Sequence, residues 1–290
     1  MGRYLDIRLL QVGYDARDIR HHVEKIKGLI AEHRQADLLV FPELCLHGHP
    51  SLERPEGFLY RKMRVAYGPI STDLYRFVRD VGARVVIGEM QRKGDELFNV
   101  ATYLDDERAP QHYVKTHVHW TEHFVPGRAL RTFETPFGPL GVNICFDAAF
   151  PEVWRTLALL GAEVIVNLSA VPASFPSRYV HRRMSAAALN NQVFVVYANR
   201  PGPVFSGESA VFDPRGETLA GLGPDEGTLR VRLDREQVAR WREQEPLWPH
   251  RRPQLYRPVT ASHWQGRRPQ FAGNGQERGD GAFATAGVGL

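Results

Sequence analysis

The sequence predicts an α/β fold of mixed sheets arranged in layers, and two observations lead to this prediction. Short apolar runs rich in Val, Ile and Leu alternate with segments of helical periodicity over most of the 290 residues. Two pairs of strand-like runs are joined by a short polar turn instead of a helix, which indicates hairpins inside the sheets. Helices between some strands and hairpins between others are typical of layered mixed sheets.

The first half of the chain is expected to hold five strands and two helices. The second helix can be capped by Ser71 or Thr72 and can end at Gly82. The segment from Pro50 to Pro69 is rich in turn formers, so we expect it to be irregular. In order, we expect a strand over 7–12, a helix over 18–33, a strand over 37–41, the second helix, and strands over 84–87, 98–104 and 111–118.

The second half repeats the alternation and then loses it. Pro151 in a first turn and Gly161 past the last turn delimit a helix. We then expect a strand over 164–168, a helix over 177–191, and strands over 193–198, 210–212, 218–220 and 229–233. From Val259 the chain is Gly-rich and without periodicity. We therefore expect one domain over residues 1–258 and a tail over 259–290.

Bulk composition indicates a globular protein with a sizeable core, since 43% of the residues are hydrophobic and 24% are charged. The net charge of +4 is spread without a block of basic and aromatic residues, which argues against nucleic-acid binding. No apolar run approaches the ~20 residues of a membrane span. The first residues, Met1–Asp6, lack the apolar core of a signal peptide, so we expect a cytoplasmic protein.

Only two cysteines are present, Cys45 and Cys145, and we expect both to be free thiols in a reducing compartment. Cys145 follows the apolar run Gly141–Ile144 and precedes the helix that starts at Pro151. A thiol at a strand end that faces a helix N-terminus is favoured as the reactive thiolate. An isolated cysteine in this position is more often core filler, so the prediction depends on two further segments.

Those two segments each place a charged residue beside an apolar strand. Glu43 ends the run from Asp37 through Phe41-Pro42, where an apolar pocket can make a carboxylate a general base. Lys115 interrupts the strand-like alternation of residues 112–118. Taken singly, a strand-end Glu is a solvated charge about half the time, and a strand Lys usually is one.

The three segments together resemble the carbon–nitrogen hydrolase, or nitrilase, superfamily. The resemblance lies in Phe41-Pro42-Glu43, in Lys115-Thr116-His117, and in the stretch from Cys145 through Phe150-Pro151-Glu152, in this order. It extends from about residue 4 to about residue 256. It implies the four-layer α-β-β-α sandwich of that family, with two mixed sheets face to face, and no cofactor.

The resemblance also implies roles for site residues. Glu43 would be the general base, Cys145 the nucleophile, and Lys115 would stabilise the oxyanion together with the backbone N–H of Phe146. Glu122 resembles a second glutamate that amidase-type members carry near the nucleophile, where it would hold Lys115 or position the substrate.

Substrate binding is assigned to Trp120 and to Ala149. Many relatives carry an arginine at the position of Ala149, where it can clamp a substrate carboxylate. Here the substrate either lacks a carboxylate near the scissile bond, or another arginine binds it; the candidates are Arg178, Arg182 and Arg200. His117, His119 and His123 have a metal-like spacing, but no remote Cys/His pair completes a site, so we expect no metal.

The favoured function is hydrolysis of a small carboxamide through a cysteine thioester, with release of ammonia or an amine. The alternatives are an N-carbamoyl (ureido) hydrolase, a nitrilase, an acyltransferase that uses the same thioester, and a scaffold without activity. The expected partners are a small amide substrate and further copies of this chain, as a homodimer or larger even homo-oligomer.

Overall fold

The computed structural model describes residues 2–14, 18–49 and 58–260, with backbone only for 58–67. Contacts divide the chain into two units, Met1–Pro246 and Leu247–Leu290. The first unit therefore ends before the expected boundary at residue 258. Residues 261–290, most of the expected tail, lie outside the described residues.

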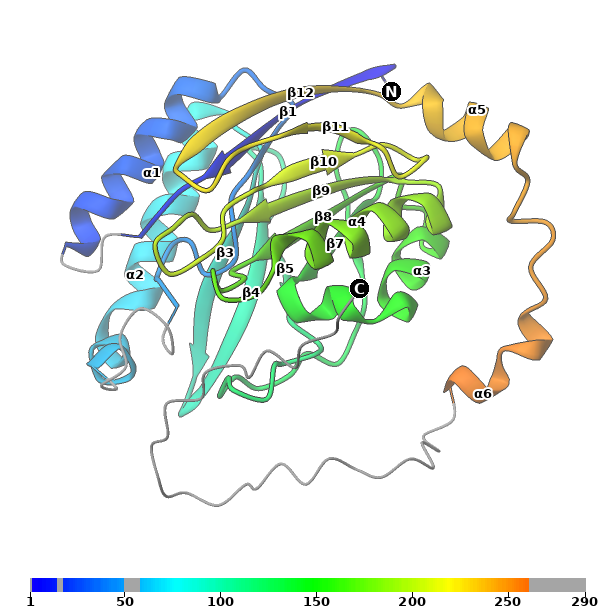
Figure 1. The fold of residues 1–290 in the computed structure, drawn as a ribbon. Coiled ribbons are helices and arrows are strands. Elements are labelled where there is room, and N and C mark those ends of the chain that lie inside the picture. The colour runs from blue at the N-terminus through cyan, green and yellow to red at the C-terminus, as the bar shows by residue number, and fades with distance from the viewer. Residues whose placement is uncertain (1, 15–17, 50–57, 261–290) are drawn as a thin grey trace. The chain divides into compact units, whose positions relative to one another are not determined.

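The first unit contains two six-stranded mixed sheets (Figure 1). The first sheet has the order β12-β1-β2-β3-β4-β5 and the second has the order β11-β10-β9-β8-β7-β6. The strands are β1 (Tyr4–Gln11), β2 (Leu38–Val40), β3 (Val85–Lys93), β4 (Glu96–Leu104), β5 (Gln111–Val114), β6 (Thr132–Phe133), β7 (Leu140–Ile144), β8 (Val164–Ser169), β9 (Phe194–Asn199), β10 (Ala210–Phe212), β11 (Thr218–Gly221) and β12 (Gly227–Asp234).

Helices cover the outer faces of both sheets, which gives the four-layer α-β-β-α sandwich that the family resemblance implied (Figure 1). Helices α1 and α2 pack beside the first sheet, and α3 and α4 pack beside the second. The helices and 3₁₀ turns of the two units are α1 (Ile19–His33), α2 (Phe58–Val81), η1 (Cys145–Ala149), α3 (Pro151–Leu159), α4 (Ser177–Asn191), α5 (Glu236–Gln244), η2 (Pro253–Leu255) and α6 (Arg257–Thr260).

The main core lies between the two sheets, because alternate residues of each strand point to that side. Ala101 and Tyr103 of β4 pack there with Val166 of β8 and Val196 of β9. A second apolar cluster fills the space between the first sheet and its helices, with Ile26 of α1 among its members. Among the described residues, no helix is long and apolar enough to cross a membrane.

Helix α2 corrects one expectation. It starts at Phe58 and continues through Pro69, whereas we expected an irregular segment up to Pro69 and a helix start at Ser71 or Thr72. Ser71 is not a cap: it lies inside the helix, is buried, and donates a hydrogen bond to the carboxylate of Glu89. The proline removes one backbone hydrogen bond, and this loss did not end the helix.

Candidate active site

Cys145 lies at the sharp turn between β7 and η1, and α3 begins at Pro151 just beyond it. Its backbone has a φ of +46°, in the left-handed region that residues with a Cβ rarely adopt. Strained conformations of this kind persist where surrounding contacts hold them, and they cluster at functional sites.

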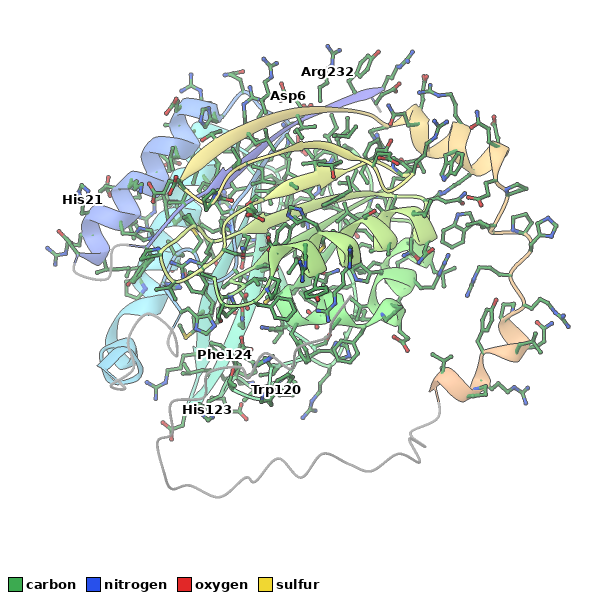
Figure 2. The ribbon with its side chains drawn as sticks, in the orientation of Figure 1. Asp6, His21, Trp120, His123, Phe124 and Arg232 are labelled. Atoms are coloured by element: carbon green, nitrogen blue, oxygen red, sulfur yellow. The ribbon has the colours of Figure 1, made fainter. Side chains whose placement is uncertain are left out.

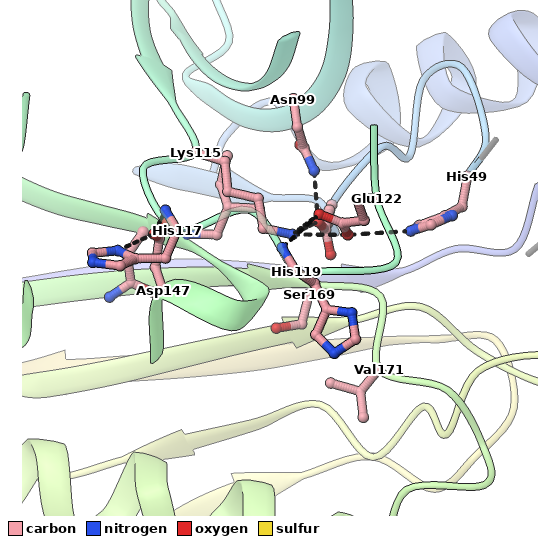
Figure 3. Close-up of polar contacts among 12 residues, drawn as sticks. His49, Asn99, Lys115, His117, His119, Glu122, Asp147, Ser169 and Val171 are labelled. Carbon is pink, nitrogen blue, oxygen red and sulfur yellow. Dashed lines mark hydrogen bonds and ion pairs between the residues drawn. The ribbon is translucent and has the colours of Figure 1, made fainter. Parts of the chain in front are cut away.

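Asp147, two residues after Cys145 in η1, forms contacts that hold this turn in place. Its Oδ2 accepts hydrogen bonds from the Ile144 N–H (3.0 Å) and the Tyr113 hydroxyl (2.8 Å). Its Oδ1 accepts from the Thr116 hydroxyl (2.9 Å) and the His117 N–H (2.8 Å), and it also contacts the His117 ring (Figure 3). Asp147 therefore ties the Cys145 turn to the residues on either side of Lys115.

Glu43 lies in the turn that follows β2 and is 1% exposed. Its Oε1 accepts hydrogen bonds from Asn99 Nδ2 (2.7 Å) and from Lys115 Nζ (2.8 Å). Its Oε2 is buried and has no hydrogen-bond partner among the described residues. One oxygen of this carboxylate is thus fixed, and the other is available to take a proton.

Lys115 follows the last residue of β5 and is fully buried. Its ammonium lies between two carboxylates, 2.8 Å from Glu43 Oε1 and 2.9 Å from Glu122 Oε2 (Figure 3). A buried ion is stable only when it is paired and hydrogen-bonded, and Lys115 satisfies both conditions.

Glu122 connects this cluster to His49, a residue that sequence reasoning did not select. The Nε2 atom of His49 lies 3.5 Å from Glu122 Oε1, and both side chains are buried (Figure 3). Burial raises the pKa of Glu122, but the hydrogen bond to His49 and the charge of Lys115 outweigh it and lower the pKa to about 2. Burial also disfavours the charged form of Lys115 and so lowers its pKa. The charges of Glu43, Cys145 and Glu122 outweigh this effect and raise the pKa well above its ordinary value.

The thiol of Cys145 differs from our expectation of a stabilised thiolate. Burial, followed by the charge of Glu43, raises its pKa; Lys115 opposes this rise, and Glu122 adds to it. The residue keeps a partly exposed surface, while its sulfur lies among these charged groups. This direction favours the protonated thiol, whose proton a neighbouring base can take as the sulfur attacks.

The two expected substrate-binding residues both have exposed surface. Trp120 is 60% exposed and stacks on the His119 ring, with the ring centres 3.7 Å apart. It also meets the Phe146 ring edge-on, with the ring centres 5.6 Å apart. Figure 2 shows Trp120 near His123 and Phe124, far from Asp6 and Arg232 on β1 and β12. Ala149 is the last residue of η1 and is partly exposed.

Two of the three histidines, His117 and His119, contact different partners. His117 contacts Asp147 and stacks on Phe150 at 3.9 Å, whereas His119 stacks on Trp120. Among the described residues, no three His, Cys, Asp or Glu side chains are arranged to hold a metal ion.

The three candidate arginines lie in two different environments. Arg178 and Arg182 are exposed on α4 and lie over the Tyr179 ring. Arg200 is fully buried, with its guanidinium 4.9 Å from the centre of the Phe205 ring. The same Phe205 ring contacts His49 at 6.0 Å, so Arg200 is joined to the cluster through one aromatic ring.

Comparisons with known proteins agree with this arrangement. The family model described as carbon–nitrogen hydrolase matches residues 6–243. An (R)-stereoselective amidase from Pseudomonas sp is 31% identical over 281 residues, which cover 94% of this chain and 100% of that protein. A nitrilase from Pyrococcus abyssi is 36% identical over 197 residues, covering 66% of this chain and 73% of the nitrilase.

A solved structure also aligns with most of the chain. It is a mutant of the amidase from Nesterenkonia sp. AN1 with the acetamide moiety of fluoroacetamide covalently added at its active-site cysteine. The TM-score is 0.74 at 25% sequence identity, and the alignment covers 88% of this chain and 96% of that chain.

Proposed function

Since this chain belongs to the carbon–nitrogen hydrolase family, we propose that it hydrolyses a small carboxamide through a thioester on Cys145 and releases ammonia or an amine. One observation carries the proposal: buried Glu43 shares one oxygen with Lys115 and keeps its other oxygen without a partner among the described residues, in a cluster that includes the Cys145 thiol. This arrangement combines a base, a cation and a nucleophile.

Acylation begins with the thiol, because a neutral thiol must lose its proton to attack. Glu43 Oε2 takes the proton while Cys145 Sγ forms a bond to the amide carbon, and the carbonyl π electrons move to oxygen. Lys115 and the backbone N–H of Phe146, at the start of η1, stabilise that oxyanion. Glu43 then gives the proton to the amide nitrogen, the C–N bond breaks, and the amine leaves.

Deacylation uses the same residues with water as the nucleophile. Glu43 takes a proton from water, the oxygen of that water attacks the thioester carbon, and the C–S bond breaks. The proton returns to sulfur, which restores the thiol and releases the carboxylic acid. Glu122 takes no proton in this scheme; it holds Lys115 charged and directed toward Glu43.

We propose a neutral amide as the substrate. Ala149 offers no cation beside the nucleophile, the guanidinium of Arg200 is buried, and Arg178 and Arg182 lie against Tyr179 on α4. Two similar proteins support a small amide as the substrate. One is the (R)-stereoselective amidase, and the other is the Nesterenkonia amidase with an acetamide adduct. Trp120 and Phe146 provide an aromatic surface for the non-reacting part of the substrate.

Intact mass spectrometry of the protein incubated with a panel of amides, ureido acids and nitriles tests this function. We expect an acyl adduct on Cys145 and released ammonia with at least one neutral amide, and neither with Cys145→Ala. Cys45→Ala is the matched control, because Cys45 is buried in the apolar cluster beside α1 and should affect stability more than turnover.

The same panel separates the alternatives. Adducts formed only with ureido acids or only with nitriles would contradict the amidase proposal. Faster release of product as a hydroxamate when hydroxylamine is added would instead indicate an acyltransferase. The two free thiols agree with a reducing compartment, and we propose the cytoplasm.

A further inference from the structure

A cleft of about 410 Å³ lies on the outer face of the first sheet, at its β5 edge. Strand alternation defines the face: Ala101 of β4 and Tyr113 of β5 point into the core between the sheets, so Phe98 and His112 point the other way. Residues of the loop from Val125 to Arg131 also line the cleft.

Positive charge dominates the polar lining of the cleft. Lys93, Arg128 and Arg131 line it, and Glu96 is the one acid among the described lining residues. No ion pair or hydrogen bond is formed by the ammonium of Lys93 or by either guanidinium with the rest of the described chain, whereas the neighbouring Arg92 is paired with Asp95. An anion that enters the cleft therefore meets three cationic side chains without having to displace a partner in the described chain.

One lining residue of the cleft, His112, is held by a partly buried hydrogen-bond network. His112 lines the cleft, and its Nδ1 contacts Thr102 Oγ1 (2.9 Å) and Gln91 Nε2 (3.2 Å). Both of these side chains also donate to the carboxylate of buried Glu89. A side chain held in this way is pre-organised, which lowers the cost of ligand binding.

Apolar side chains form the rest of the lining. Phe98, Val114, Val125 and Pro126 all contribute to it. A lining that combines cationic side chains with an apolar wall suits a small molecule with an anionic group on an apolar body.

The cleft is separate from the candidate active site. Val114 points into the cleft, while the next residue, Lys115, belongs to the cluster with Glu43. The Gly127 N–H donates to the Lys115 carbonyl at 2.7 Å, so the backbone itself forms the partition between the two.

We propose that this cleft is a second binding site, which takes a small organic anion. The anionic group, a carboxylate or a phosphate, binds Arg128, Arg131 and Lys93, and the apolar body packs on Phe98 and Val114. The inference is independent of the reaction at Cys145.

Calorimetric titration of the full chain with phenyl phosphate at low ionic strength tests the site. We expect a dissociation constant of about 0.1–1 mM for the wild type, since few-atom ligands bind in this range. Arg128→Glu/Arg131→Glu should weaken binding by at least about tenfold, and added salt should weaken it as well. Arg79→Glu is the matched control: Arg79 is exposed and precedes β3 by a few residues, at the end opposite Lys93.

Two titrations and a second variant complete the design. Inorganic phosphate should bind more weakly than phenyl phosphate, and phenol should bind more weakly still. Arg128→Gln/Arg131→Gln, which removes the charges without reversing them, should also lose binding while its circular dichroism and amide turnover stay at wild-type values. The proposal is overturned if the wild type does not bind phenyl phosphate, if phenol binds equally well, or if both double variants bind like the wild type.

Discussion

At the scale of single residues, the candidate active site depends on how two buried carboxylates share one ammonium. Glu43 and Glu122 both contact Lys115, and all three side chains are almost fully buried. Two carboxylates that share one site cannot both stay ionised unless a cation lies between them. Lys115 therefore balances the charge of the two carboxylates, and the stability of the cluster depends on it.

Lys115→Met should lower the rate and the stability together. The rate should fall at least about 100-fold, because an oxyanion contact is lost. The free energy of unfolding should fall by about 3–5 kcal/mol, because two carboxylates remain buried without a cation. Urea denaturation measures the second effect, and Lys115→Met/Glu122→Gln should recover part of the stability but none of the rate. Wild-type stability in the single variant would contradict this account.

Glu122 should make stability depend on pH. Its pKa of about 2 in the folded chain lies below the ordinary 4.5, so its ionised form stabilises the fold above pH 4.5. This contribution is lost as the pH falls from 4.5 toward 2. Glu122→Gln should therefore be less stable than the wild type at pH 7, and the difference should shrink across that window in urea denaturation. A constant difference would show that the ionisation of Glu122 does not contribute.

Substrate preference should follow from the missing cation at Ala149. A neutral amide should be cleaved faster than a similar amide with a nearby carboxylate, because burying an unpaired charge costs several kcal/mol. Ala149→Arg should shift kcat/KM toward the acidic amide and harm the neutral one by crowding. If the wild type prefers the acidic amide, another arginine binds the carboxylate. Arg200, Arg178 and Arg182 would then each be replaced by Gln to find it.

The sequence pointed to Glu43, Lys115 and Cys145 by motif order, and the structure places these side chains together; their roles stay predictions. His49 and Asn99 could not be found in this way. His49 is 73 positions before Glu122, and its contact exists only because the chain after β2 lies beside the loop after β5. No local pattern carries that information.

At the scale of elements, the sequence predicted the ends of a helix or strand correctly where local residue preferences determine them. The helix over 177–191 and the strand over 210–212 have the expected ends. Helix α2 ends at Val81, just before Gly82 as expected, but it starts earlier than expected. Pro69 and Ser71 indicate a helix start by propensity, whereas tertiary contacts such as Ser71 with Glu89 decide the outcome. The two-residue strand β6 was missed because two residues show no periodicity.

Gly88 of β3 positions the turn that carries Glu43. A Cβ at residue 88 would lie 2.4 Å from the Pro42 carbonyl oxygen and 2.5 Å from the Leu44 nitrogen, so the turn must move. Gly88→Ala should therefore lower kcat by about 100-fold, since a displacement near 1 Å has that effect on catalytic geometry.

Gly28→Ala is the matched control for Gly88→Ala. A Cβ at residue 28 meets nothing within 4 Å, and the residue lies inside helix α1. This variant should keep full activity and gain about 0.5–1 kcal/mol of stability. If Gly88→Ala is as active as Gly28→Ala, the close approach of β3 does not position Glu43.

At the scale of the whole molecule, long-range pairing completes the fold. Strand β12 pairs antiparallel with β1 over its full length, which joins residues 227–234 to residues 4–11. The sequence predicted both strands, but a partner more than 200 positions away leaves no signal in either. The face-to-face packing of the two sheets came from the family resemblance, because alternation alone indicates layers without their order.

Exposed apolar side chains support the expected association of this chain into a homo-oligomer. Leu159, Leu160 and Tyr179 are 51%, 47% and 42% exposed on or next to the outer-layer helices α3 and α4. In the second unit, Leu255 and Val259 are 55% and 57% exposed. Apolar side chains on an outer helix layer are typical of an interface between copies related by a two-fold axis.

We therefore expect a homodimer or larger even oligomer at micromolar concentration, measured by light scattering. Tyr179→Glu should weaken the assembly without unfolding the chain, because an exposed side chain contributes little to the core of its own subunit.

Truncation after Pro246 should leave the first unit folded, since its sheets and cores lie within Met1–Pro246, but should reduce association if the following residues reach the partner. A monomeric wild type would refute the assembly, whereas a truncated chain that unfolds would show that the first unit depends on residues beyond Pro246.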